Sequence, residues 1–204
     1  MERRPHDMPS LVFLDPRWGA VIPARRVSVV MIAVVASCGR TCGTLPNVPR
    51  TLGEIRVDGE LSEVDWRLAF RSGPFVDAAT GQEQRPYSEA RFVRDDRLLY
   101  VALYAADENI LSEQDAFHVT SGAYAIDIGP DAKVTPVAET STRGLACAVD
   151  LDGTLDDADD DDEEWTAELA IPMSVVSLRE MELSRCDTPK SGARRCGVFS
   201  FVPR

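Results

Sequence analysis

Trp165-Thr166-Ala167-Glu168-Leu169-Ala170-Ile171-Pro172 is the stretch that decides the fold. Every second side chain from Trp165 to Ile171 is apolar, and the side chains of Thr166 and Glu168 point the other way. A period of two is the repeat of a strand, so this pattern predicts a β-strand with one buried face. The proline that follows is expected to end it.

The rest of the chain has the same character. Residues 98–106 are almost all apolar and rich in β-forming residues, which predicts a central strand buried on both faces. We expect further short strands at residues 55–57, 87–93, 124–128, 134–137 and 145–151, the last pairing with 165–171. A single helical turn is expected at 61–66, capped by Ser62. Many short strands separated by Gly, Pro and Asp predict an all-β fold, an antiparallel sandwich of immunoglobulin-like or jelly-roll-like architecture.

The charge of the 204-residue chain is concentrated in one segment. The formal net charge is −12, and ten of the 34 acidic residues lie between positions 150 and 164. This balance argues against a nucleic-acid partner, which needs a basic face. Clustered carboxylates suit Ca²⁺, and we name four candidate ligands, Asp152, Asp156, Asp160 and Asp162. The alternative is a solvated loop held open by its own charge, since the segment does not follow the EF-hand pattern.

The first 50 residues predict an export signal and a tether. Arg25-Arg26 precedes an apolar run at 27–36, and Ser37-Cys38 follows. This order is typical of a secretory signal, and the run is about half the length that a membrane-spanning helix needs. Residues 35–38 resemble a bacterial lipobox, which implies cleavage after residue 37, a lipid on Cys38 and a tether at 38–50. We therefore expect an exported protein of the bacterial cell envelope, in the periplasm or at the outer membrane, anchored by lipid only. The alternative is a buried helix in which the Cys occurs by chance.

An exported chain permits disulfides. Cys186 and Cys196 flank a turn-rich insert at 187–195, so we expect a disulfide between them, with free thiols as the alternative. Its short loop would stabilise the fold by about 2–3 kcal/mol. The sequence does not decide the pairing of Cys42 and Cys147. No zinc site is expected, because there is no Cys-x-x-Cys pair and the mature chain has one His.

Three blocks of the chain carry recognisable motifs. They are Asp58-Gly59-Glu60-Leu61-Ser62-Glu63-Val64-Asp65-Trp66, then Asp95-Asp96-Arg97-Leu98-Leu99-Tyr100-Val101-Ala102 with Asp107-Glu108-Asn109, and finally Asp152-Gly153-Thr154-Leu155 leading to the stretch at 165–172. These blocks resemble family 9 carbohydrate-binding modules and their DOMON-like relatives. They stand in the family's order across residues 54–176. The resemblance implies a β-sandwich domain at 51–204 that binds an oligosaccharide or polysaccharide without cleaving it, often with structural calcium.

The residues of the family's sugar site are poorly matched. Ser112 stands where the resemblance implies a sugar-stacking Trp, and His118 falls near a ligand-contacting Glu. As candidate ligand contacts we name four residues, Arg91, Asp115, His118 and Tyr124. Trp66 and Trp165 belong to the framework blocks, so we expect both in the core. The family's late loop and last strand are not matched before Arg204, which would leave a sheet edge open to a protein partner.

Two other functions compete with sugar binding. DOMON-like relatives include haem-binding electron carriers, for which His118 with Met173 or Met181 would be the axial pair. A surface lipoprotein whose sandwich only contacts another protein is the second alternative. No motif supplies a nucleophile with its base, so we expect no enzyme.

Overall fold

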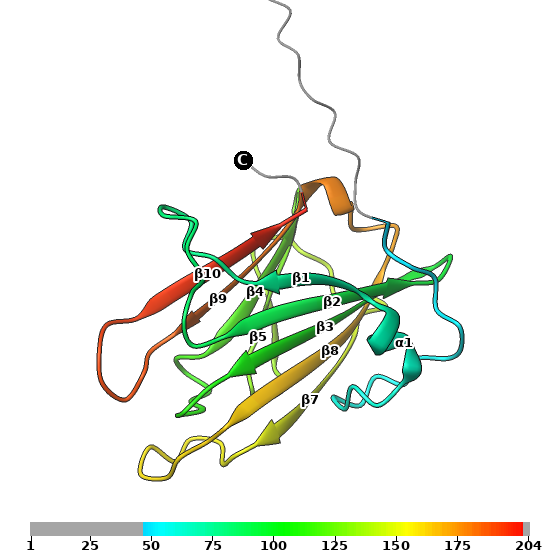
Figure 1. Ribbon diagram of the computed structural model, residues 1–204. Coiled ribbons are helices and arrows are strands. Elements are labelled where there is room, and N and C mark those ends of the chain that lie inside the picture. Colours follow the sequence, from blue (N-terminus) through cyan, green and yellow to red (C-terminus); the bar gives the residue numbers. More distant parts are fainter. Residues whose placement is uncertain (1–46, 202–204) are drawn as a thin grey trace, which may run out of the picture. The chain divides into compact units, whose positions relative to one another are not determined.

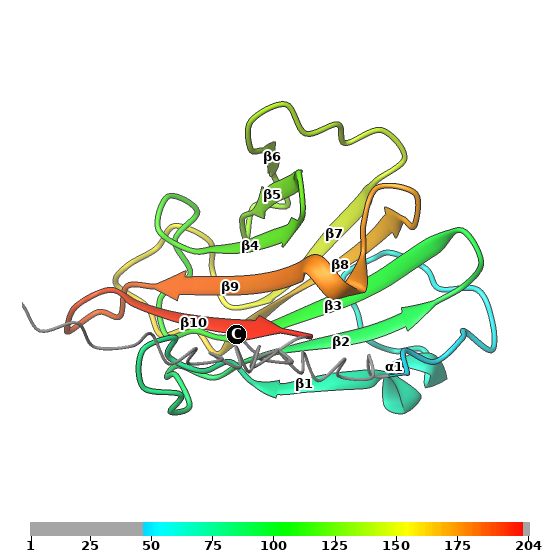
Figure 2. The ribbon, with the colours of Figure 1, turned by 90° about the horizontal axis from the view of Figure 1, so that it is seen from above.

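The computed structural model describes residues 47–201, which form two five-stranded antiparallel sheets packed face to face (Figures 1 and 2). In spatial order, sheet A contains β1 (Phe70–Pro74), β2 (Ser88–Arg94), β3 (Leu98–Ala106), β8 (Glu164–Pro172) and β7 (Ala146–Asp152). Sheet B contains β10 (Arg195–Ser200), β9 (Met181–Asp187), β4 (Ala116–Ser121), β5 (Tyr124–Ile128) and β6 (Val134–Pro136). Two short helices complete the domain, α1 (Val64–Leu68) and the 3₁₀ turn η1 (Leu178–Glu180). The predicted all-β sandwich is confirmed.

The core lies between the sheets, where the period-two pattern places it. Trp165 and Ile171 of β8 are fully buried, together with the alternate residues between them. β3 is the middle strand of sheet A, paired with β2 on one side and β8 on the other, as its apolar sequence predicts. Trp66 is also buried, but in a second apolar cluster on the outer face of sheet A. There α1 and the segment before it cover one end of the sheet (Figure 1).

Glu168 joins the first and last of the three sequence blocks. Its carboxylate accepts the backbone N–H groups of Asp58 at 2.9 Å and Gly59 at 3.0 Å, and the indole N–H of Trp66 at 2.8 Å. Gly59 has a φ of 92°, and a Cβ there would lie 2.6 Å from the backbone of β7. The Asp-Gly turn therefore sits directly on sheet A.

Four strands and one boundary differ from the sequence expectations. β1, β4, β9 and β10 were not predicted, whereas residues 55–57 are not a strand and only place Ile55 in the outer apolar cluster. The helical turn begins at Val64, later than expected, and its N-cap is Glu63 rather than Ser62. Trp66 of α1 packs in one apolar cluster with Val93 and Tyr100 of sheet A, and no side chain caps the helix. Tertiary packing therefore outweighs the local capping preference.

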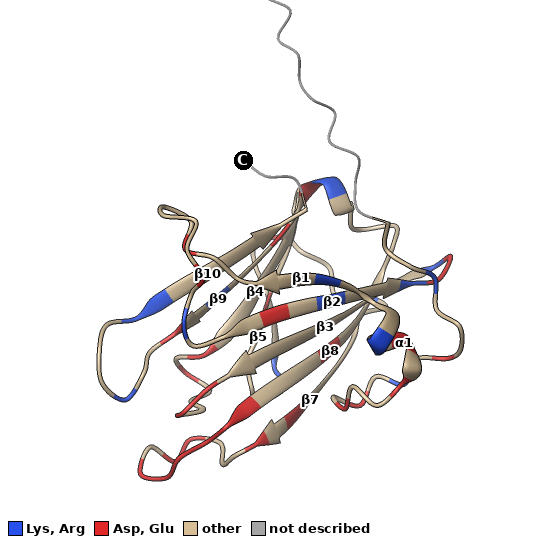
Figure 3. Ribbon diagram, viewed as in Figure 1, with Lys and Arg blue, Asp and Glu red and all other residues tan. Residues whose placement is uncertain are grey.

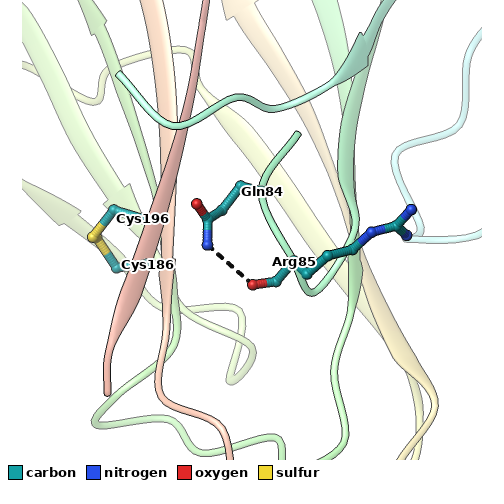
Figure 4. Close-up of a disulfide and its surroundings, with 4 residues drawn as sticks. All are labelled: Gln84, Arg85, Cys186 and Cys196. Carbon is teal, nitrogen blue, oxygen red and sulfur yellow. Dashed lines mark hydrogen bonds between the residues drawn. A yellow bond between two sulfur atoms is a disulfide. The ribbon is translucent and has the colours of Figure 1, made fainter. Parts of the chain in front are cut away.

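The predicted disulfide between Cys186 and Cys196 is confirmed (Figure 4). The two residues are directly opposite each other in the β9–β10 pair. In the same view, the side-chain amide of Gln84 donates to the carbonyl of Arg85 at 3.1 Å. This segment lies along the outer edge of β10, where Val76 and Val198 exchange two backbone hydrogen bonds. The edge expected to be open is thus partly paired within the chain.

Cys38, Cys42 and the expected signal peptide lie outside the described residues. Cys147, on β7, is a half-buried free thiol whose pKa burial raises to about 11. Residues 47–201 contain no helix long and apolar enough to cross a membrane.

Candidate functional site: a tyrosine-bearing face of sheet A

The four side chains predicted to contact a ligand are not brought together. His118 lies on the outer face of sheet B, where its Nδ1 pairs with the carboxylate of Asp127. Asp115 and Tyr124 lie between the sheets, only 2% and 6% exposed. Arg91 lies on the outer face of the other sheet, on β2. The sequence therefore named residues from three separate regions.

The four acids predicted to hold calcium do not converge either. Both oxygens of Asp162 accept backbone N–H groups at 2.7 Å, from Ile110 and Thr154. Asp156 accepts the N–H and the hydroxyl of Ser112. Within residues 47–201, no three of the four predicted ligands (Asp152, Asp156, Asp160, Asp162) place carboxylate oxygens within 4.8 Å of one another. The acidic segment instead fastens the loop after β3 to the loop before β8.

Within residues 47–201, His118 does not face the same side as either methionine named for the haem alternative. Met181 is buried in the core between the sheets, and Met173 packs at the edge of that core. His118 points to the opposite side of sheet B, since its neighbours Phe117 and Val119 are the buried members of β4. A haem iron would need its two axial ligands on one side of the sheet.

A different group of side chains gathers on the outer face of sheet A, at the end that α1 leaves uncovered (Figure 1). We call it the tyrosine face and define it by six residues, Arg71, Tyr87, Glu89, Arg91, Tyr104 and Glu164. The alternation of the strands places them there, because the residues between them, such as Phe92 and Leu103, fill the core. Figure 3 shows the resulting mixture of acidic and basic segments on β1, β2 and the start of β8.

Two half-buried tyrosine rings form the apolar part of this face. Tyr87 and Tyr104 meet edge to face, with ring centroids 5.9 Å apart and planes at 64°. The phenol of Tyr104 donates to the carboxylate of Glu164, and the phenol of Tyr87 donates to Glu89 at 2.9 Å. Burial, together with Glu164, raises the pKa of Tyr104 to about 12. Both phenols therefore remain neutral hydrogen-bonding groups at physiological pH.

A buried carboxylate orders the basic part of the face. Glu89 is 4% exposed and accepts hydrogen bonds from Arg71 at 2.7 Å and from Arg91 at 2.9 Å. Burial alone would raise the pKa of Glu89, but the hydrogen bonds from Arg71, Arg91 and Tyr87 outweigh it and hold that pKa below its usual value. Arg71 bonds both oxygens of this carboxylate and Arg91 shares Oε1 with it, so one buried group orients both guanidinium groups.

This arrangement provides what a neutral, hydroxyl-rich ligand requires. Aromatic rings offer apolar surface to the C–H faces of a sugar, and fixed charged or phenolic groups bond its hydroxyls. Asp150 and Asp152 of β7 add acceptors next to this face, because they pair with Thr166 and Glu164 of β8. Five of the six residues lie on strands, and Tyr87 directly precedes β2, where its carbonyl accepts the N–H of Ala106 at 2.9 Å. The strands therefore set the spacing of these groups without a ligand.

Sequence reasoning found Arg91 but missed the other five members of the tyrosine face. Tyr104 was treated only as part of an apolar run, and β1, which carries Arg71, was not predicted. One signal was available. A tyrosine within an otherwise aliphatic strand needs a polar partner for its hydroxyl. Such a tyrosine therefore indicates a position where the strand is no longer fully covered by apolar side chains.

Comparison with solved structures identifies the fold. Two solved structures of a family 9 carbohydrate-binding module from Caldicellulosiruptor kristjanssonii match it, one in complex with cellotriose (TM-score 0.52, 14% identity) and one with glucose (TM-score 0.53, 16% identity). Each match covers 74% of this chain and 82% of the other. The domain has the fold of a family 9 carbohydrate-binding module. A putative carbohydrate-binding protein from Bacteroides uniformis is also similar, at a TM-score of 0.48 and 12% identity. No family model and no curated protein matches the chain.

Proposed function

We propose that this domain binds a carbohydrate, without cleaving it, on the tyrosine face of sheet A. The observation that carries the proposal is the Tyr87–Tyr104 pair, held half-exposed beside fixed arginine and carboxylate groups. The fold supports it, since the two modules with the same fold were solved with glucose and with cellotriose. The class of ligand is a neutral oligosaccharide or polysaccharide presenting both C–H faces and hydroxyls.

Removing the rings should abolish or strongly weaken binding. The purified protein would be run in affinity gels containing soluble β-glucans, xylans and mannans, and screened on a glycan array. For any glycan that retains the protein, we expect Tyr104→Ala and Tyr87→Ala each to lower the affinity about tenfold. This corresponds to a loss of about 1.4 kcal/mol in binding free energy.

The control is His118→Ala, which changes the face of sheet B where the family resemblance implies ligand contacts. If this variant loses binding and the tyrosine variants keep it, the ligand lies on sheet B and the location proposed here is wrong. If the unaltered protein is retained by no polysaccharide, sugar binding itself is refuted, and a protein partner for the exposed face becomes the next hypothesis to test.

We also propose that the domain is displayed on the cell envelope by a lipid on Cys38. The support is the order of charges, apolar run and small residues before that cysteine. Cys38→Ala should move the protein from the membrane fraction to the soluble fraction of cells. Unchanged fractionation would exclude the anchor, whatever the domain binds.

A further inference from the structure

Three buried aspartates meet between the two sheets, at the end of the sandwich where β3, β4 and β9 approach one another. Asp107, Asp115 and Asp187 are each 2–3% exposed, and each places a carboxylate oxygen within 4.8 Å of the others. Isolated buried carboxylates are costly, so such a group requires a positive partner. A divalent cation is the usual partner for three converging carboxylates, and the family resemblance implies structural calcium.

In this chain a buried cationic side chain already bonds two of the three aspartates. Arg185 enters from β9 and is 3% exposed. Its Nη2 donates to Asp107 at 2.6 Å and to Asp187 at 3.0 Å. Its Nη1 donates to the carbonyl of Ala106 at 3.1 Å and to the hydroxyl of Ser88 at 3.3 Å. The guanidinium is thus bonded to both sheets, since Ser88 begins β2 in sheet A.

This geometry does not fit a calcium ion. Calcium takes six to eight oxygens at about 2.3–2.6 Å, and here one oxygen of Asp107 and one of Asp187 already accept hydrogen bonds from Arg185. The same Asp107 oxygen also accepts the indole N–H of Trp165 at 3.3 Å. An ion within reach of all three aspartates would stand beside a fixed, buried guanidinium, and their repulsion in a region of low dielectric would be large.

Three carboxylates and one guanidinium group leave an excess of negative charge, which protonation of an aspartate would reduce. Asp115 accepts the N–H of Leu111 through one oxygen, and its other oxygen has no hydrogen-bond partner. Burial raises the pKa of Asp115 to about 7, with the neighbouring Asp107 and Asp187 adding to the rise and the N–H of Leu111 opposing it. Burial also raises the pKa of Asp187, against the opposing charge of Arg185, so a proton on either acid would reduce the negative charge of the group.

We infer that Arg185 is a built-in cation that takes the place of a bound divalent ion, so that this end of the sandwich is assembled without calcium. The inference concerns stability and metal dependence, and it does not depend on the carbohydrate proposal. It explains why a chain with 34 acidic residues places an arginine, the side chain that bonds two carboxylates at once, at the one buried position of β9 that faces three of them.

The test compares thermal unfolding of the full chain in EDTA and in millimolar CaCl₂. For the unaltered protein we expect the two melting temperatures to agree to about 1 °C, because an ion that does not bind the folded state cannot stabilise it. Arg185→Gln leaves three carboxylates without a cation, so its melting temperature should fall and then rise again with added calcium. Arg185→Lys keeps the charge and should respond to calcium less than Arg185→Gln.

The matched control is Arg50→Gln, which removes an exposed arginine paired with Asp96 at the surface. It should change neither the melting temperature nor the response to calcium. A saturable rise in the melting temperature of the unaltered protein with calcium, lost in Asp115→Asn, would overturn the inference. If Arg185→Gln does not fold, the calcium titration of the unaltered protein and of Arg185→Lys still decides.

Discussion

At the scale of single residues, Glu168 connects the first and the last of the three sequence blocks through hydrogen bonds. It lies on β8 and is fully buried, and its two oxygens accept three N–H groups from the Asp58–Gly59 turn and from Trp66. Burial raises its pKa to about 7, although each of these hydrogen bonds opposes the rise. One carboxylate therefore holds residues that are more than a hundred positions away in the sequence.

Glu168→Ala should destabilise the domain by about 3 kcal/mol or more, because it leaves three buried donors without an acceptor and each costs about 1–3 kcal/mol. Glu168→Gln keeps one carbonyl oxygen and should cost less. Urea unfolding measures both values. The control is Glu60→Ala, an exposed position in the same turn, for which a change within about 0.5 kcal/mol is expected. Equal losses for Glu60→Ala and Glu168→Ala would contradict this account.

At the scale of strands and helices, the sequence predicted the elements that carry a complete alternation. β2, β3, β5, β6, β7 and β8 agree with the expected segments to within a residue at each end, and β7 pairs with β8 as expected. β4 was missed because its alternation is short, with Phe117 and Val119 as its large apolar residues, and β9 was missed because Arg185 and Asp187 take two of its inward positions. His118 lies on the outer face of β4, whereas Arg185 of β9 points inward and is paired there. A buried arginine cannot be distinguished from a surface one until its partners are known.

The candidate site shows the same limit. Arg91 was named as a ligand contact on general grounds, but its role depends on Glu89 and Arg71, and Arg71 lies on a strand that the sequence did not reveal. The family resemblance directed attention to His118, which lies on the outer face of sheet B. The paired rings of Tyr87 and Tyr104 lie on the other sheet, where the pairing of β2 with β3 brings the segment before β2 beside the end of β3. The register between strands that are distant in the sequence cannot be predicted from a local sequence pattern.

At the scale of the whole domain, stability should fall as the pH rises through neutrality. Asp115 and Glu168 both have pKa values raised to about 7 in the folded protein, above their ordinary values of 3.8 and 4.5. Between those limits the folded state holds more protons than the unfolded state. The stability that these two groups contribute is therefore complete at acidic pH and is lost as the pH rises through about 7.

Urea unfolding at pH 5.5 and pH 8 measures this effect, with the free energy of unfolding expected to be larger at about pH 5.5. Asp115→Asn removes one of the two groups and should flatten the dependence. Carboxylates with lowered pKa, such as Glu89, act in the opposite direction, but only below their ordinary range. A free energy that rises from pH 5.5 to pH 8 would show that neither buried acid holds its proton in the folded state.

Lys190 connects the loop closed by the disulfide to the acidic segment before β8. Lys190 lies in the loop closed by Cys186 and Cys196, and its ammonium group bonds Asp161 at 2.8 Å and the carbonyl of Asp160. It is one of two lysines in the chain, and it is placed against the segment that carries ten acidic residues. The disulfide between Cys186 and Cys196 thus limits where the Lys190 ammonium group can lie. That positive charge in turn reduces the repulsion among the carboxylates around Asp160 and Asp161, some thirty positions away in the sequence. Reduction of the disulfide should therefore loosen the contacts that the Lys190 ammonium group makes with Asp160 and Asp161.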